Sequence, residues 1–165
     1  MKKLKSIQLY FFSIIKLSLL SFRNYYFGSN FYNKKLITFI PDRIFYNPST
    51  HLSSSLTAVS NDFYKITDTS PELLWKTNVK EKLKFENLHS FLWLAKLDRK
   101  HSKEFTKNII ESWIDNYFNF EPNTWKMEIA AKRIIAWVSN TDIVLQGSDK
   151  IYKEKFFLSL IKQSN

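Results

Sequence analysis

The sequence predicts a mainly helical protein, and three observations support this. Only 2 of its 165 residues are glycine and 4 are proline, so the residues that favour turns are scarce. Over residues 71–165, apolar residues recur at the spacing of helices that bury one face. The links between these periodic segments are short, which is typical of antiparallel helical neighbours. A short irregular or β-containing segment is expected near residues 36–66.

The composition excludes several kinds of site. Without cysteine, the chain has no disulfide, no cysteine-ligated zinc and no cysteine nucleophile. Gly28 and Gly147 lie outside any glycine-rich phosphate-binding motif, which excludes the common nucleotide loops. We therefore expect no cofactor. The apolar content of 44% indicates a chain that folds.

The charge of the chain is basic and uneven. The formal net charge is +10, and residues 1–60 carry 8 Lys or Arg against the single acid Asp42. Such a surface attracts nucleic acid, anionic lipid or an acidic polysaccharide. An AT-rich genome is an alternative explanation for so many lysines. Nucleic acid is the least favoured of the three partners, because the lysines are scattered and no nucleic-acid-binding motif occurs.

Residues 1–35 predict a basic amphipathic helix and a linker. Lysines precede the apolar stretch 7–22, as in a signal peptide, but Lys16 interrupts it and bulky residues follow where a cleavage site would lie. The uninterrupted apolar run is also too short to span a bilayer. We expect a helix over residues 3–22, which packs on the body of the protein or, alternatively, lies on a membrane surface. A cytoplasmic or membrane-associated location is favoured over the periplasm.

Residues 36–70 predict short strands and loops. The run 36–40 has the composition of a strand and ends at a proline, and residues 63–66 form a second candidate strand. The stretch 51–61 shows no strong periodicity, so we expect it to connect other elements.

Residues 71–165 predict helical hairpins. Ser70 and Pro71 suit a helix start, because serine caps helices and proline fits the first helical position. Four amphipathic segments follow. Their apolar faces comprise Leu88, Phe91, Leu92 and Ala95; Phe105, Ile109, Ile110, Trp113, Ile114 and Tyr117; Trp125, Ile129, Ile134, Trp137 and Val138; and Phe156, Phe157, Leu160 and Ile161.

No motif identifies a catalytic residue. The histidines His51, His89 and His101 are not spaced as metal ligands, so we expect no metal site. His89, on an aromatic-rich segment, is the first of the three to consider for a function, although a lone histidine is usually structural. No serine stands in a nucleophile elbow.

The most informative segment is residues 125–137. Trp125, Arg133 and Trp137 are spaced by multiples of four, which predicts one row on a helix. An arginine between tryptophans needs a carboxylate or carbonyl partner, or an indole face to stack on. Arg133 therefore either fixes this helix to a neighbour or contacts a sugar or carboxylate in a cleft.

Three blocks of aromatic and charged residues follow one another in an order and at a spacing that resemble those of one protein family. Residues 88–97 and 113–114 precede a third block, with the pattern Trp-x-x-Glu-x-Ala-x-x-Arg-Ile-Ile-x-Trp over residues 125–137. Over roughly residues 36–162, these blocks resemble the N-terminal helical region of heparinase II/III-like proteins. The positions that we expect to support the fold are Trp93, Trp113, Glu128 and Trp137.

The resemblance implies a partial (α/α) toroid of antiparallel helical hairpins, which in the family continues into more hairpins and a β-sandwich. The family's lyases cleave uronic-acid-containing polysaccharides by β-elimination, with Tyr and His as base and acid. Those motifs come later in the family's sequences, so we expect an N-terminal fragment that is inactive by itself and transfer no catalytic residue. Trp125 and Arg133 are the candidates for contacting an acidic glycan.

Two other interpretations stay open. The chain is alternatively a small basic helical protein that binds a membrane surface or nucleic acid through residues 1–35, or the remnant of a broken gene. A reading frame that continues into hairpins with Tyr and His motifs would favour the lyase, and a true stop codon would favour the binding protein. Whether the 165-residue chain is itself an enzyme also stays open.

Overall fold

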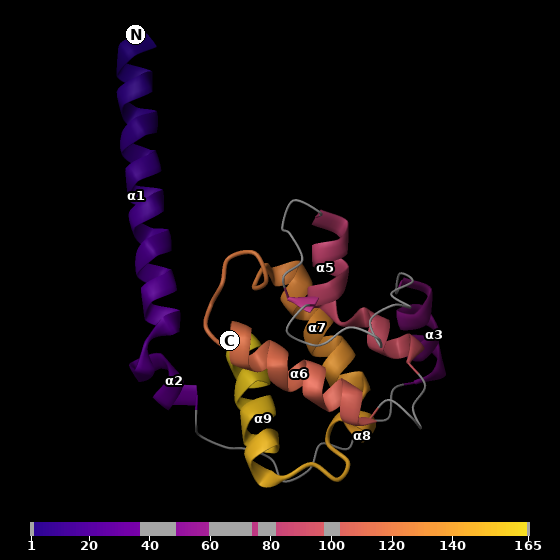
Figure 1. The fold of residues 1–165 in the computed structure, drawn as a ribbon. Coiled ribbons are helices and arrows are strands. Elements are labelled where there is room, and N and C mark those ends of the chain that lie inside the picture. The colour runs from indigo at the N-terminus through magenta and orange to yellow at the C-terminus, as the bar shows by residue number, and fades with distance from the viewer. Residues whose placement is uncertain (1, 37–48, 60–73, 76–81, 98–102, 165) are drawn as a thin grey trace. The chain divides into compact units, whose positions relative to one another are not determined.

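The computed structural model describes residues 2–36, 49–59, 74–75, 82–97 and 103–164 (Figure 1). The elements in these ranges are all helices, which confirms the mainly helical prediction. The chain divides into two compact units, Met1–Ile37 and Thr38–Asn165. Among the helices of the described ranges, none is both long enough and apolar enough to cross a membrane.

The first unit consists of two helices, α1 (Lys2–Gly28) and α2 (Asn30–Leu36). The chain turns at Ser29, whose hydroxyl donates to the Tyr26 carbonyl oxygen at 2.7 Å and accepts the Tyr32 amide at 3.2 Å. The rings of Tyr26 and Tyr32 pack 5.2 Å apart across this turn. α1 includes all of residues 3–22, the range in which the sequence predicted a helix.

The first described element of the second unit is a helix, where we expected a connecting segment. α3 covers Thr50–Val59, and the Ser49 hydroxyl accepts the Leu52 amide at 3.2 Å, as a capping serine does. The local signal was weak because three consecutive serines interrupt the apolar spacing. The candidate strands at 37–40 and 63–66 lie outside the described residues.

One helix boundary differs from the boundary that we expected, and two expected features lie outside the described residues. Leu36, expected to start a strand, ends α2. The helix start proposed at Ser70 and Pro71 lies outside the described residues, as does His101.

The segment around Phe91 is a helix break and not one continuous helix. α5 (Lys82–Ser90) ends just before Phe91, which has φ 57, and a 3₁₀ helix, η2 (Leu92–Lys96), follows. The indole nitrogen of Trp93 donates to the Leu88 carbonyl oxygen at 3.2 Å and so closes the turn. A left-handed non-glycine residue costs about 1–2 kcal/mol. Full burial of the Phe91 ring offsets this cost.

Four further helices lie in the described part of the second unit: α6 (Lys103–Tyr117), α7 (Met127–Ser139), α8 (Thr141–Val144) and α9 (Lys150–Ser164). Contacts of α6 and α7 with α9, and of α5 and η2 with α7, enclose one core. Its buried members are Leu74, Trp75, Leu88, Phe91, Leu92, Trp93, Leu94, Ile109, Ile110, Trp113, Ile114, Ala136, Trp137, Val144, Tyr152, Phe156, Phe157 and Leu160.

Candidate functional site

Arg133 on α7 is a buried cation that joins several elements. Its side chain is fully buried. Nη1 donates to the carbonyl oxygens of His89 at 3.0 Å and Thr124 at 3.1 Å, and Nε donates to Gln163 Oε1. These bonds connect α7 to the end of α5, to the segment before α7 and to α9. Arg133 therefore lies in the core, where it fixes α7 to its neighbours, and not in an open cleft.

The charge of Arg133 is stabilised by dipoles and an aromatic ring. The guanidinium carbon lies 4.0 Å from the centre of the Trp113 ring, which is a cation–π contact. Burial lowers the pKa of Arg133 to about 9, so the side chain is still charged at neutral pH. Its Nη2 has no hydrogen-bond partner within the described residues.

His89, at the end of α5, is a buried neutral imidazole. Its Nδ1 accepts a hydrogen bond from the Trp113 indole nitrogen at 3.0 Å, which leaves the ring proton on Nε2. The ring lies 4.2 Å from that of Phe85. Burial, and secondly the charge of Arg133, lowers the pKa of His89 to about 3. His89 is therefore uncharged at neutral pH.

Tyr117 and His89 form the kind of pair that could exchange protons, with rings 5.0 Å apart and edge to face. Their environment opposes this chemistry. The Tyr117 hydroxyl donates to the Trp75 carbonyl oxygen at 3.4 Å, and burial, followed by the charge of Glu121, raises its pKa. An efficient acid or base has a pKa near the working pH. We therefore assign the pair to the packing of the core.

The tryptophan landmarks also lie in the core. Trp113 and Trp137 are fully buried and meet edge to face with ring centres 5.4 Å apart. Trp93 stacks on Phe91 at 5.5 Å, and Phe91 in turn contacts both Trp113 and Trp137. Aromatic residues from η2, α6 and α7 thus form one continuous cluster.

Trp125 precedes α7, so the expected row of Trp125, Arg133 and Trp137 on one helix is wrong. The Glu121 carboxylate accepts the backbone amide of Thr124 at 2.7 Å, and the Trp125 amide donates to the Glu121 carbonyl oxygen at 2.9 Å. These bonds stabilise a turn and delay the start of α7. Trp125 is half-buried, and its indole nitrogen donates to the Tyr117 carbonyl oxygen at 3.0 Å.

Glu128 and Lys132 form the exposed ion pair that their spacing suggests. Lys132 Nζ lies 2.8 Å from Glu128 Oε1 within α7. The hydrogen bond from Lys132 lowers the pKa of Glu128. Glu128 is exposed on the surface of α7, whereas Arg133 on the same helix is buried.

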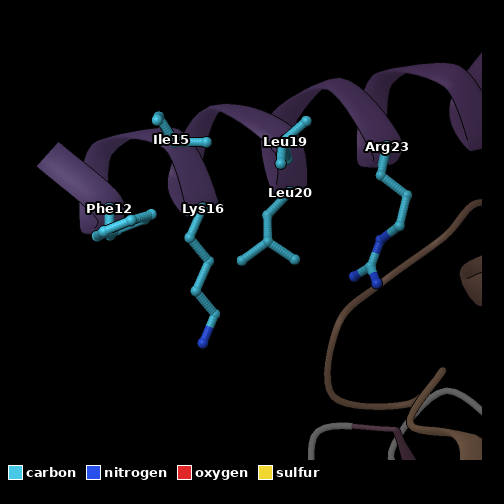
Figure 2. Close-up of a pocket in the computed structure, with 6 residues that line it drawn as sticks. All are labelled: Phe12, Ile15, Lys16, Leu19, Leu20 and Arg23. Carbon is cyan, nitrogen blue, oxygen red and sulfur yellow. The ribbon is translucent and has the colours of Figure 1, made fainter.

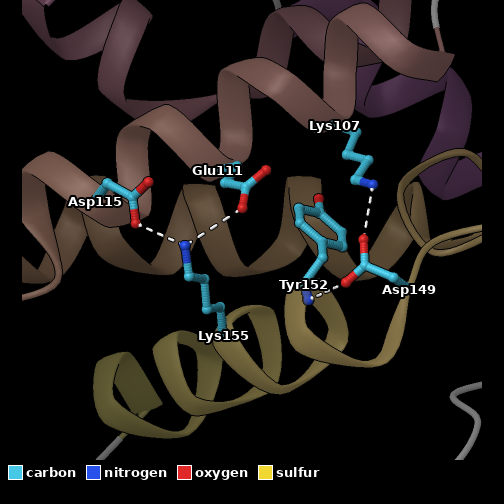
Figure 3. Close-up of polar contacts among 6 residues, drawn as sticks. All are labelled: Lys107, Glu111, Asp115, Asp149, Tyr152 and Lys155. Carbon is cyan, nitrogen blue, oxygen red and sulfur yellow. Dashed lines mark hydrogen bonds and ion pairs between the residues drawn. The ribbon is translucent and has the colours of Figure 1, made fainter.

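A polar network joins α6 to α9 on the surface (Figure 3). Lys155 Nζ lies between Asp115 Oδ1, at 3.1 Å, and Glu111 Oε1, at 3.3 Å. The bond to Asp115, and then the bond to Glu111, raises the pKa of Lys155, while burial has the opposite effect. Because each carboxylate is already paired with this cation, we assign the group to helix packing.

A second part of this network stabilises the start of α9. Asp149 Oδ1 accepts the Tyr152 amide at 2.8 Å, and its Oδ2 lies 3.2 Å from Lys107 Nζ (Figure 3). The backbone hydrogen bond from Tyr152 and then the one from Lys107 lower the pKa of Asp149. Asp149 is thus a helix cap that also forms an ion pair.

Sequence reasoning missed Thr124 and Lys162 as buried residues and Gln163 as a partner of Arg133. Lys162 is 3% exposed, lies 4.2 Å from the Phe118 ring centre and donates to Asn119 Oδ1 at 3.4 Å. Burial lowers its pKa to about 8. The residues after Ile161 are polar, although Lys162 and Gln163 continue α9. The helical period of α9 was the signal that could have found these two residues.

The first unit presents a different surface. A shallow pocket lies along α1, and Figure 2 shows Lys16, Leu20 and Arg23 projecting to one side of the helix while Ile15 projects to the other. The lining residues are Phe12, Ile15, Lys16, Leu19, Leu20 and Arg23.

In the part of the chain that the structure describes, no group of three or more His, Cys, Asp or Glu side chains could hold a metal ion. Comparison with protein-family models, curated proteins and solved structures finds no match to this chain.

Proposed function

We propose that this chain supplies the first helical hairpins of a heparinase II/III-like polysaccharide lyase and acts there as a scaffold. Such a lyase acts on an acidic polysaccharide. A base removes the C5 proton of the uronic acid, the C4–O bond breaks, the leaving oxygen takes up a proton, and a C4=C5 double bond forms. In this proposal the catalytic groups lie in the further toroid helices and the β-sandwich, outside these 165 residues.

The observation that carries the proposal is the convergence of the three sequence blocks. The blocks at residues 88–97, 113–114 and 125–137 are separate in the sequence. Their aromatic side chains form one cluster, and Arg133 from the third block bonds to the first and stacks on the second. Residues that carry the family resemblance are therefore also the residues that hold the helices together, as a fold signature should.

The state of His89 and Tyr117 supports the scaffold role. A lyase needs a group that transfers protons near neutral pH, and His89, with a pKa of about 3, is not such a group. Arg133, fully buried, is likewise engaged by protein groups and not by a ligand. The proposal therefore assigns glycan contact to no residue of the core.

The test starts with the coding sequence around these codons. We would sequence the DNA beyond codon 165 and express both the 165-residue chain and any longer product. Each would be incubated with heparin, chondroitin sulfate and alginate, and the unsaturated uronide would be followed by its ultraviolet absorbance.

We expect product from the longer protein and none from the 165-residue chain. A stop codon with no neighbouring frame that encodes further hairpins would contradict the proposal. A longer protein that leaves all three glycans intact would contradict it as well.

A further inference from the structure

The first unit concentrates positive charge. Residues 1–36 contain no Asp or Glu. A segment with this composition attracts anionic surfaces and repels a second copy of itself. Its basic residues are Lys2, Lys3, Lys5, Lys16, Arg23, Lys34 and Lys35.

One side of α1 forms an exposed apolar face, which we define by residues at the spacing of one helical face. Between 44% and 78% of the area of each of these side chains is exposed. So large a set of exposed apolar side chains is typical of an interaction surface. The apolar face comprises Ile7, Phe11, Ile14, Phe22 and Tyr25.

Three basic residues lie on the other side of the helix, together with the apolar Leu9, Phe12 and Leu20. Lys5, Lys16 and Arg23 are spaced by eleven and seven residues, which brings them onto a single row at 100° per residue. Lys16 and Arg23 project to the same side in Figure 2. We define these three as the basic row. The basic row thus lies opposite the apolar face, as the charged residues do in helices that lie in the plane of a membrane interface.

We propose that α1 binds the surface of an anionic lipid bilayer, with the apolar face among the acyl chains and the basic row toward the headgroups. In this orientation the apolar face is removed from water and the basic row lies next to negative charge. Nucleic acid would match the charge but leave the apolar face in water, and a second copy would match the apolar face but bring like charges together. The proposal is independent of the lyase assignment.

The test measures sedimentation of the full chain with lipid vesicles. Phosphatidylcholine vesicles with about one-third phosphatidylglycerol should bind the protein, and pure phosphatidylcholine should bind it at least about tenfold more weakly. Added salt should weaken the first interaction, since surface charges are screened. No sedimentation with the anionic vesicles would overturn the proposal.

A matched pair of variants separates the apolar face from overall charge. Phe11→Asp and Leu9→Asp add the same charge two residues apart, at side chains that are 62% and 68% exposed, but Leu9 lies on the side of the basic row. Phe11→Asp should bind anionic vesicles about tenfold more weakly than Leu9→Asp, because only it removes a buried aromatic contact with lipid.

Circular dichroism should show equal helix content for both variants. Equal vesicle binding by the two would refute the orientation proposed for α1. Retention of a DNA duplex without vesicle binding would assign the basic row to nucleic acid. Concentration-dependent dimers without vesicle binding would assign the apolar face to a second copy, and either result rejects the membrane proposal.

Discussion

At the scale of single residues, the core of the second unit depends on a buried cation that hydrogen-bonds to carbonyl oxygens. Arg133 bonds to the carbonyl oxygens of His89 and Thr124 and stacks on Trp113. Burying a charge is costly, and the cost is recovered only when the geometry of its partners is good. Loss of this side chain would leave a cavity in the core and two carbonyl oxygens without their hydrogen-bond donor.

Arg133→Ala should therefore lower the free energy of unfolding by about 3 kcal/mol or more. Lys132→Ala, one residue earlier, removes only the exposed pair with Glu128 and should cost less than about 1 kcal/mol. Urea unfolding followed by tryptophan fluorescence measures both. Equal losses for the two variants would show that Arg133 does not hold the core.

His89 should make stability depend on pH. Its pKa is about 3 in the folded protein against 6.5 ordinarily, so between these values only the unfolded chain binds the proton. The free energy of unfolding therefore falls as the pH drops below about 6.5, by up to about 1.4 kcal/mol per pH unit.

His89→Gln keeps a hydrogen-bond acceptor for Trp113 but does not titrate. It should flatten this slope over about pH 5 to 6.5, measured by urea unfolding at several pH values. His51→Gln, at an exposed position on α3, is the control and should leave the slope unchanged. If His89→Gln kept the same dependence of unfolding free energy on pH, His89 would be ruled out as its source.

At the scale of elements, two short segments determine how the helices of the second unit follow one another. Phe91 turns the chain between α5 and η2 with a φ of 57, and Gly147 does so before α9 with a φ of 74. The first position is occupied by a large apolar residue because its ring fills the core. The second is glycine, which adopts this conformation without strain.

Gly147→Ala should lower stability by about 1 kcal/mol through the backbone alone. A Cβ atom at this position meets no atom within 4 Å, so no clash contributes. Gly147→Asn should cost less, since asparagine tolerates the left-handed region. Thermal unfolding compares the two, and an unchanged midpoint for alanine would contradict the strained conformation.

Asp149 contributes to α9 mainly as a cap. Asp149→Ala should lower the midpoint of thermal unfolding, because the Tyr152 amide loses its acceptor. Asp149→Ser keeps a capping oxygen and loses only the exposed pair with Lys107, so it should lower the midpoint clearly less than alanine does. Equal destabilisation by the two substitutions would assign the effect to the ion pair.

At the scale of the whole molecule, the net charge of +10 governs binding to polyanions. Heparin, DNA and dextran sulfate columns should all retain the protein at neutral pH, and retention should fall steeply with salt. Arg133→Ala should elute with the wild type, because the removed charge is buried. Heparin retention at a salt concentration that releases the other two polymers would indicate a specific glycan site.

Much of the local structure follows from the sequence. Scarce glycine and proline and the helical spacing of apolar residues predict helices, and α1, α6, α7 and α9 form in segments where helices are expected. The ion pair of Glu128 with Lys132 follows from one turn of helix. These features depend on neighbours within a few residues, which the sequence displays directly.

The tertiary structure alone decided the rest. The burial of Arg133 and the lowered pKa of His89 depend on groups 24 to 44 residues away in the chain. The break at Phe91 likewise depends on the contacts of its ring with Trp113 and Trp137. The turn that holds Trp125 ahead of α7 depends on a capping carboxylate that competes with the helical period. Periodicity assigns a residue to a face, but only packing determines which groups desolvate it and which accept its hydrogen bonds.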